Sequence, residues 1–296
     1  MTSTDPLEVD PFAADDPNAR IGHLYRLRRA AHRFIVRYAE ALWAVEQEFS
    51  GRFTAPPTVT ALPARQRPKA LVADEAARVC DAHLYGLDEA ATATAVALGA
   101  RMVEFNSSDA GPDVQRAWSP VAAPPAASGL LRWASGIGYD SLGVPLIAVL
   151  WGPLSDGTWL AFWADNRVAV RNDMAQDGRT RSQARLVLQE FGPLATTGIA
   201  TTHIPRPDAE PPTRPPAVPC AESPPAPIDP LLALTSTVVS SWALLTTPGA
   251  ARLATRAPKD DAARDRRAGL TPRPATLATR PIDTHIAQWP GWKASA

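Results

Sequence analysis

The chain has 296 residues, an apolar fraction of 45% and a formal net charge of zero. This length allows one large or two modest domains with a hydrophobic core, and the zero net charge excludes a global field that would attract nucleic acid or anionic membranes. Proline accounts for 31 residues. That is roughly twice the usual share of about 5%, so part of the chain is expected to be linker rather than core.

The cysteines and the first residues of the chain indicate the cellular compartment of the protein. Cys80 and Cys220 both lie outside any CxxC motif, so neither a disulfide framework nor a zinc site is predicted. The first ten residues are acidic, whereas a secretory signal peptide needs a basic start and an apolar run. The sequence therefore predicts a cytoplasmic protein, and no cofactor or metal is expected.

Opposed blocks of charge open the chain. Residues 1–16 carry five acids and no base, and we interpret them as an acidic tail. Asp16 and Pro17 then supply an N-cap and an N1 proline. Apolar residues recur at spacings of three and four up to Gly51, which predicts a long helix over 17–50. A proline-rich extended connector follows.

Two shorter helices are predicted over 71–84 and 88–105. The sequence YGLD separates them, with Gly86 as the C′ residue of the first helix and Asp88 as the N-cap of the second. This helical hairpin is similar to a helix-turn-helix in outline only. The second helix begins with acidic and small residues, so no sequence-specific DNA reading is expected from it.

Residues 129–171 change character and predict a small, mostly antiparallel sheet. An Asp-Gly pair between two apolar runs predicts a hairpin, and both faces of that hairpin are apolar, so the sheet is expected to be covered on both sides. Its tryptophans are interpreted as core, because no base lies between Arg132 and Arg167 to form a base-stacking surface. The four predicted strands are GLLRWA (129–134), PLIAVLW (145–151), TWLAFWA (158–164) and RVAVR (167–171).

Glycines after the first of these strands could suggest a phosphate-binding loop. Gly136 and Gly138 lie in the sequence SGIGYDSLG, but a strand follows where such a loop needs a helix. A turn-rich connection is therefore predicted. A short helix over 182–191 follows, with Ser182 as its N-cap and Gly192 after its end.

The last third of the chain is predicted to hold a proline-rich linker over 201–229, a helix over 230–247 and a basic tail. The helix is uncharged, but Ser and Thr separate its apolar positions. A soluble amphipathic helix is therefore favoured over a membrane span. Residues 252–280 carry eight bases and three acids, a composition that favours a flexible segment or one that folds on a partner.

These elements define an α+β protein. It has a long N-terminal helix and a helical hairpin packed around the sheet, then the linker and a C-terminal helix with the basic tail. The expected divisions are an acidic tail (1–16), an α+β domain (17–200), a proline-rich linker (201–229) and a helix plus basic tail (230–296).

A stripe of arginines on the first helix is the main candidate site. Its members step by three and four residues and so share one face, where they could track the phosphates of nucleic acid. Two alternatives stay open, a solvated helix face or a clamp for the acidic tail. The candidate nucleic-acid-binding residues are Arg26, Arg29, Arg33 and Arg37 in this stripe and Arg264, Arg266 and Arg267 in the basic tail.

Two other functional classes compete with this hypothesis. A protein-interaction module, of antitoxin-like or regulatory kind, would dock a partner through Leu234, Val238 and Trp242 of the helix over 230–247 and through the proline-rich run. A metal-dependent hydrolase or nuclease would require loop carboxylates to converge in one place, although none has an ordered motif spacing. Those carboxylates are Asp140, Asp156, Asp165, Asp173 and Glu190, with His203 near them in sequence.

Two runs of sequence carry a resemblance. WGPLSDGTWLAFW, together with TSTVVSSWALLTTPGAARLATRAPKDDAARDRRAGLTPRPATLATRPID, resembles a group of uncharacterised actinobacterial proteins associated with plasmids and phages. The 27 arginines against three lysines agree with a GC-rich genome. The resemblance implies a cytoplasmic, mobile-element setting and no catalytic residues. In that group a segment rich in Arg, His and Trp follows TPRP, so a terminal module is expected to be missing here.

The leading hypothesis from the sequence is therefore a non-enzymatic accessory protein of a mobile element. It would contact nucleic acid through the arginine stripe and the basic tail.

Overall fold

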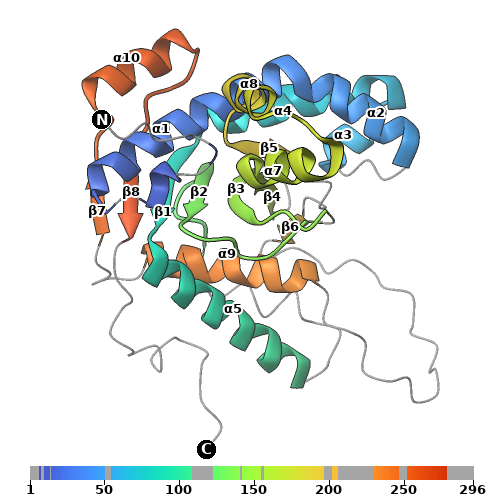
Figure 1. Cartoon of the computed structure of the whole chain (residues 1–296). Coiled ribbons are helices and arrows are strands. Elements are labelled where there is room, and N and C mark those ends of the chain that lie inside the picture. The colour runs from blue at the N-terminus through green and yellow to red at the C-terminus, as the bar shows by residue number, and fades with distance from the viewer. Residues whose placement is uncertain are drawn as a thin grey trace, which may run out of the picture.

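A single mixed sheet with helices on both faces organises the computed structural model (Figure 1). The predicted α+β class is thereby confirmed. The structure describes residues 7, 10–13, 15–50, 55–108, 123–140, 142–154, 157–196, 202–205, 230–246 and 252–278. Most of the predicted proline-rich linker (206–229) and the last residues of the chain (279–296) lie outside this described part.

The sheet has eight strands in the order β5-β4-β3-β2-β1-β8-β7, and β6 also pairs with β4. Strand β1 is parallel to β2 and to β8, and the other pairs are antiparallel. The sheet is thus mostly antiparallel, as predicted, but wider than expected and parallel at its centre. The strands are β1 (His83–Leu87), β2 (Gly129–Trp133), β3 (Leu146–Pro153), β4 (Gly157–Asp165), β5 (Leu194–Thr196), β6 (Thr202–Pro205), β7 (Arg252–Thr255) and β8 (Ala275–Ala278).

Two helical layers cover this sheet. One layer contains α1 (Pro17–Phe34), the π-helix η2 (Ile35–Ala39), α2 (Glu40–Ser50) and α4 (Arg67–Asp81), and the other contains α5 (Glu89–Ser108) and α9 (Pro230–Thr246) (Figure 1). The predicted helix over 17–50 is confirmed as three consecutive helical elements, and the Asp16 carboxylate accepts a hydrogen bond from the Asn18 amide at its start. The remaining helices are the short η1 (Pro11–Ala13), α3 (Pro57–Thr60) and η3 (Ala64–Gln66), followed by α7 (Asn166–Asp177), α8 (Arg181–Phe191) and α10 (Lys259–Arg267).

The predicted helical hairpin is wrong, because its supposed turn is the central strand of the sheet. Helix α4 ends at Asp81, and residues 83–87 form β1 between β2 and β8. Gly86 therefore lies within a strand rather than at a helix C-terminus. Asp88 does cap α5 as predicted, since its carboxylate accepts a hydrogen bond from the Ala91 amide at 2.8 Å. One of the two pairing partners of β1, the strand β8, lies some 190 residues further along the chain, where local patterns cannot reveal it.

The fourth predicted strand, RVAVR, is also wrong. These residues belong to α7, which begins because the Asp165 carboxylate accepts a hydrogen bond from the Arg167 amide. The N-cap of α8 is Thr180 rather than Ser182. Thr180 and Gln183 form a reciprocal capping box, which is stronger than a single capping hydroxyl. Gly192 follows the end of α8, as predicted.

Helix α9 is confirmed over 230–246, but it is not amphipathic in the expected sense. All of its hydroxyl-bearing residues except Thr246 are buried along with its apolar ones, because the helix packs between α5 and the sheet. A Cβ on Gly99 of α5 would lie only 2.8 Å from the backbone nitrogen of Thr237, so the two helices approach closely. The hydroxyls of Thr237 and Ser241 donate to carbonyl oxygens of their own helix. Within the described part of the chain, no helix is both long and apolar enough to cross a membrane.

This burial removes one of the two docking elements of the protein-interaction hypothesis, while the other, the proline-rich run, lies mostly outside the described residues. Leu234, Val238 and Trp242 all lie in the hydrophobic core between α9 and the sheet. They stabilise the fold and are not exposed to a partner in this structure.

The expected flexible tail is wrong for residues 252–278. They form β7, α10 and β8, and β8 adds to the sheet beside β1. Strands from the predicted α+β domain and from the predicted tail therefore share one sheet. Leu277 of β8 is completely buried, which explains why a segment with few apolar residues is held in place.

Candidate cationic groove

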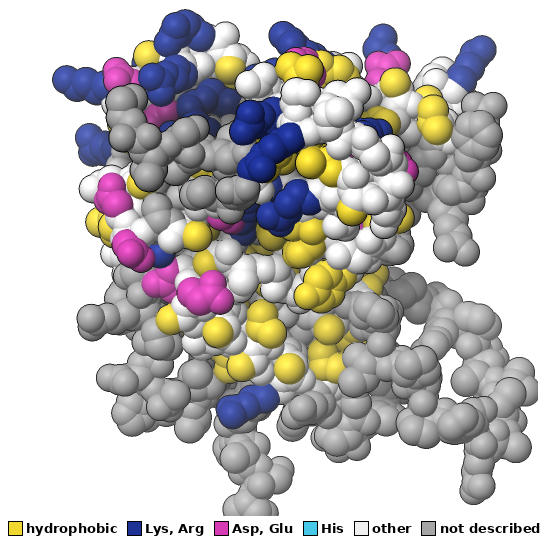
Figure 2. All heavy atoms as spheres, viewed as in Figure 1, with side chains coloured by type: hydrophobic (Ala, Val, Ile, Leu, Met, Phe, Trp, Pro, Cys, Tyr) yellow, Lys and Arg dark blue, Asp and Glu magenta, His cyan; other side chains and the backbone are white. Residues whose placement is uncertain are grey.

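Four arginines line a groove on the surface between α1, η2 and the end of α8. Its volume is about 610 Å³, and its lining includes Arg26, Arg29, Arg33 and Arg37 together with His32. Leu188, Gly192, Pro193 and Ala268 also line it, and among the described residues the lining contains no acid. Figure 2 shows Lys and Arg side chains gathered over the upper part of this face, where α1, α8 and α10 lie. We call this feature the cationic groove.

The packing of α1 turns the stripe outward. Leu24, Leu27 and Ala31 of α1 are buried against the core, so the opposite side of the helix faces solvent. The helix then continues as the π-helix η2, an uncommon conformation that often marks functional positions. Arg37 belongs to this π-helical segment, which lies directly in the wall of the groove. The stripe predicted from the sequence therefore exists as one surface.

Arg29 differs from the other members of the stripe, because it is committed to an ion-pair network. Its guanidinium lies 2.8 Å from a carboxylate oxygen of Asp265 and 2.9 Å from one of Asp261, both on α10. The neighbouring Arg28 is fully buried and donates to Asp265 and to the Ala82 carbonyl oxygen. These contacts fasten α10 to α1. In the described residues, the acids that pair with Arg28 and Arg29 thus come from α10.

The other three groove arginines keep most of their capacity to bind an anion. Arg26 is exposed and makes no ion pair with any other residue in the described ranges. Arg33 donates one hydrogen bond, to the Gln189 carbonyl oxygen at 3.2 Å. Arg37 lies 3.8 Å from Glu190, and both side chains are at least half exposed. Exposed pairs of this kind contribute only about 0–1 kcal/mol, so they yield easily to a ligand.

The arginines of α10 adjoin the groove. Arg264, Arg266 and Arg267 are exposed. Their contacts include a 3.8 Å approach of Arg264 to Asp261 and a long hydrogen bond from Arg267 to its own helix. Ala268, which directly follows α10, lines the groove. The two predicted sets of arginines are therefore brought together, because the Arg28 and Arg29 pairs hold α10 against α1.

Histidine adds little charge to the groove at neutral pH. Burial lowers the pKa of His32, and the nearby Arg28 lowers it further. The ring is therefore neutral near pH 7 and leaves the arginines as the source of positive potential.

The carboxylates proposed for a hydrolase do not form a metal site in the described residues, where no group of three His, Cys, Asp or Glu side chains could hold an ion. Asp140 accepts from the amides of Leu142 and Val144, and Asp165 caps α7. Asp173 pairs with Arg179 at 3.2 Å. Asp156 and the side chain of His203 lie outside what the structure describes.

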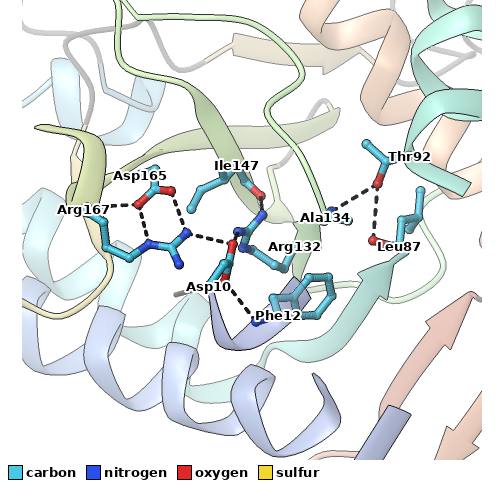
Figure 3. A network of polar contacts seen from close by, with 9 residues as sticks. All are labelled: Asp10, Phe12, Leu87, Thr92, Arg132, Ala134, Ile147, Asp165 and Arg167. Atoms are coloured by element: carbon cyan, nitrogen blue, oxygen red, sulfur yellow. Dashed lines mark hydrogen bonds and ion pairs between the residues drawn. The ribbon is translucent and has the colours of Figure 1, made fainter. Parts of the chain in front are cut away.

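A second cluster of charged side chains, which sequence patterns did not predict, includes Asp10 of the N-terminal segment (Figure 3). Asp10 pairs with Arg132 at 2.6 Å and with Arg167 at 2.7 Å, and Arg167 also pairs with Asp165. The acidic tail is thus not a free tail at Asp10. More than 120 residues separate Asp10 from either arginine, so no local motif signals the contact.

The protein is thus an α+β protein with a groove lined by four arginines, of which Arg29 is held in ion pairs and Arg26, Arg33 and Arg37 are exposed. Comparison with family models, with curated proteins and with solved structures finds no match. The chemistry of the groove is therefore argued from its own residues.

Proposed function

We propose that the protein binds nucleic acid through the cationic groove, by contacting phosphates without reading the base sequence. The observation that carries this proposal is the lining of the groove, which among the described residues contains four arginines and no carboxylate. Arginine is the side chain best suited to phosphate, because its planar guanidinium donates two parallel hydrogen bonds and stays charged at any physiological pH.

The shape of the charged surface favours a polyanion over a small anion. Arg26 and Arg37 are 11 residues apart, which corresponds to about 16 Å along a helix at about 1.5 Å per residue. One phosphate group contacts only one or two of these side chains. Duplex DNA carries one charge per about 1.7 Å of its axis, so a strand lying along the groove presents a phosphate to each arginine in turn.

The environment of the aromatic residues favours phosphate contact over base stacking. Trp151 and Trp163 of the β3–β4 hairpin are at most 2% exposed, so they form core, as the sequence predicted, and offer no stacking platform. Backbone phosphates position a protein on nucleic acid, whereas base edges supply specificity. We therefore expect binding with a weak preference among sequences.

The test is a fluorescence-anisotropy titration with labelled duplex DNA, single-stranded DNA and RNA at low salt. We expect the triple variant Arg26→Gln, Arg33→Gln, Arg37→Gln to bind about ten- to a hundred-fold more weakly than the wild type. The matched control is Arg101→Gln, which removes an exposed arginine of α5 on the opposite face of the sheet. An affinity that survives the triple substitution, or that falls equally in the control, would refute the proposal.

The cellular setting stays a prediction. The resemblance that suggested a cytoplasmic accessory protein of a mobile element rests on the two quoted runs of sequence. A non-enzymatic role agrees with a surface that can hold nucleic acid through exposed arginines alone.

A further inference from the structure

The N-terminal segment occupies a specific place at the carboxyl ends of the central strands (Figure 3). Gly86 of β1 pairs in register with Arg132 of β2, and both are the last residues but one of their strands. A Cβ on Gly86 would lie 2.7 Å from the Cζ atom of Phe12. The missing side chain therefore creates the space in which the Phe12 ring sits.

Arg132 and Arg167 hold the carboxylate of the same segment. Oδ2 of Asp10 accepts hydrogen bonds from both guanidinium groups, at 2.6 and 2.7 Å, and Oδ1 accepts one from the Phe12 amide at 2.9 Å. The guanidinium carbon of Arg132 lies 5.2 Å from the centre of the Phe12 ring, within reach of a cation–π interaction. One arginine thus contacts both a carboxylate and an aromatic ring. We call these five residues, Asp10, Phe12, Gly86, Arg132 and Arg167, the Arg132 site.

The buried positive charge of Arg132 needs an anion beside it. Arg132 is 1% exposed, its only other hydrogen bond in the described residues goes to the Ile147 carbonyl oxygen, and its Nε atom has no partner. Arg167 keeps Asp165 as a second counterion, but Arg132 makes no hydrogen bond to any other carboxylate in the structure as described. Burial, followed by the charge of Arg132, lowers the pKa of the adjacent His23 to about 3. His23 is therefore neutral at pH 7. Without Asp10, Arg132 would lose its only directly bonded carboxylate in the described residues and keep only the more distant charge of Asp165.

We propose that the Arg132 site is a ligand site for a carboxylate with an aromatic ring beside it, and that residues Asp10–Phe12 occupy it as an intramolecular ligand. Open α/β sheets bind ligands at the carboxyl ends of their parallel strands, and β1 and β2 form such a parallel pair within this mostly antiparallel sheet. The strand ends are also fixed there, because the Thr92 hydroxyl donates to the Leu87 carbonyl oxygen and accepts from the Ala134 amide (Figure 3). The occupant, by contrast, is a single 3-10 turn that belongs to no strand. A free ligand of the same chemistry competes with it. This inference does not depend on the proposed nucleic-acid binding.

The first test opens the site in the full-length protein with the double substitution Asp10→Ala, Phe12→Ala. The probe is the blocked peptide acetyl-Val-Asp-Pro-Phe-Ala-amide, titrated by calorimetry. We expect saturable binding of one peptide per chain, at least about ten-fold tighter than to the wild type, where the native segment competes. A peptide with Asn in place of Asp is the matched control and should not bind. A folded double variant that ignores the peptide, or equal binding to wild type and variant, would overturn the proposal.

A second test keeps the proposal falsifiable if the double variant does not fold. Asp10→Ala alone leaves space for a small carboxylate, so acetate should raise the melting temperature of this variant as a ligand of the folded state. The same concentration of chloride is the control for ionic strength. Acetate that raises the melting temperature of the variant no more than that of the wild type would show that no carboxylate site exists there.

Discussion

Arg26 and Arg28 lie two residues apart on α1, and their surroundings are opposite. Arg28 is fully buried, with Asp265 and the Ala82 carbonyl oxygen as partners, whereas Arg26 is exposed in the wall of the cationic groove. Two residues correspond to about 200° around a helix, so one points to the core and the other to solvent. Arginines that are neighbours in sequence can therefore have different roles. Buried ones such as Arg28 stabilise the fold, and only exposed ones such as Arg26 can bind a ligand.

The same contrast recurs elsewhere in the molecule. Arg132 and Arg167 are buried with Asp10 and Asp165, while Arg266 and Arg267 of α10 are exposed. Buried arginines need their counterions, because removing one partner leaves a desolvated charge. Exposed arginines lose little when their neighbours are changed.

The largest effect is expected from Asp265→Ala. The change leaves Arg28 without its buried counterion and removes one partner of Arg29, so the free energy of unfolding should fall by about 3–5 kcal/mol. Urea denaturation followed by circular dichroism measures it. Asp260→Ala, at an exposed acid of the same helix, is the control and should stay within about 0.5 kcal/mol of the wild type. Similar values for the two variants would contradict a structural role for the buried pair.

The Arg132 site should make the protein sensitive to acid. Burial and the charge of Arg132 lower the pKa of His23 to about 3. Between pH 6.5 and pH 3 His23 is therefore protonated in the unfolded chain and neutral in the folded protein. Stability should therefore decrease as the pH falls from about 6.5 to 3. Asp10 adds a second loss. Burial alone would raise its pKa, but Arg132 and Arg167 lower it to about 2, so its contribution disappears between about pH 4 and pH 2.

Unfolding by urea at a series of pH values checks this prediction. His23→Gln should flatten the decrease above pH 4, because it removes the group that titrates only in the unfolded chain. A wild-type stability that does not change between pH 6.5 and pH 4 would contradict the buried environment of His23.

A smaller effect of opposite sign is expected from Glu75, which is buried on α4. Burial raises its pKa to about 8, although Arg78 acts in the other direction. The folded protein therefore keeps a proton that the unfolded chain loses above its usual pKa of about 4.3. The stabilisation is complete below that value and disappears as the pH rises through 8. Glu75→Gln should be more stable than the wild type at pH 8 and similar to it at pH 4, as measured by thermal unfolding at both pH values.

The sequence predicted those parts of the fold that local patterns determine. The helix over 17–50, the strands on either side of the Asp-Gly turn and the helix that begins at Pro230 follow from periodicity and capping. It could not predict β1, because these five residues, which include Gly86, become a strand only through pairing with β2 and β8. The sequence also did not predict that residues 252–278 of the basic tail fold into β7, α10 and β8. The reason is the same, since β8 pairs with β1, which is far away in the chain.

The positions of the candidate site residues were predicted from the sequence. Which of these arginines are exposed and which are held in ion pairs was not. Helical spacing placed Arg26, Arg33 and Arg37 on one surface, and the structure brings them to one groove. Spacing also included Arg29, which α10 engages. No local feature distinguishes an arginine that will meet Asp261 and Asp265 more than 230 residues later. The Arg132 site was missed because its parts come from four distant segments, namely the η1 turn, β1, β2 and the start of α7.

If the groove arginines are free to neutralise phosphates, DNA binding by this protein must weaken with salt in proportion to the number of those arginines. The decisive measurement is therefore the salt dependence of DNA binding. The logarithm of the binding constant should fall linearly with the logarithm of salt concentration for the wild type. In the triple variant Arg26→Gln, Arg33→Gln, Arg37→Gln the slope should be shallower by about 2 to 3, because each phosphate contact contributes about 0.7–0.9. Equal slopes for variant and wild type would mean that these arginines touch no phosphate, and the proposed function would be wrong.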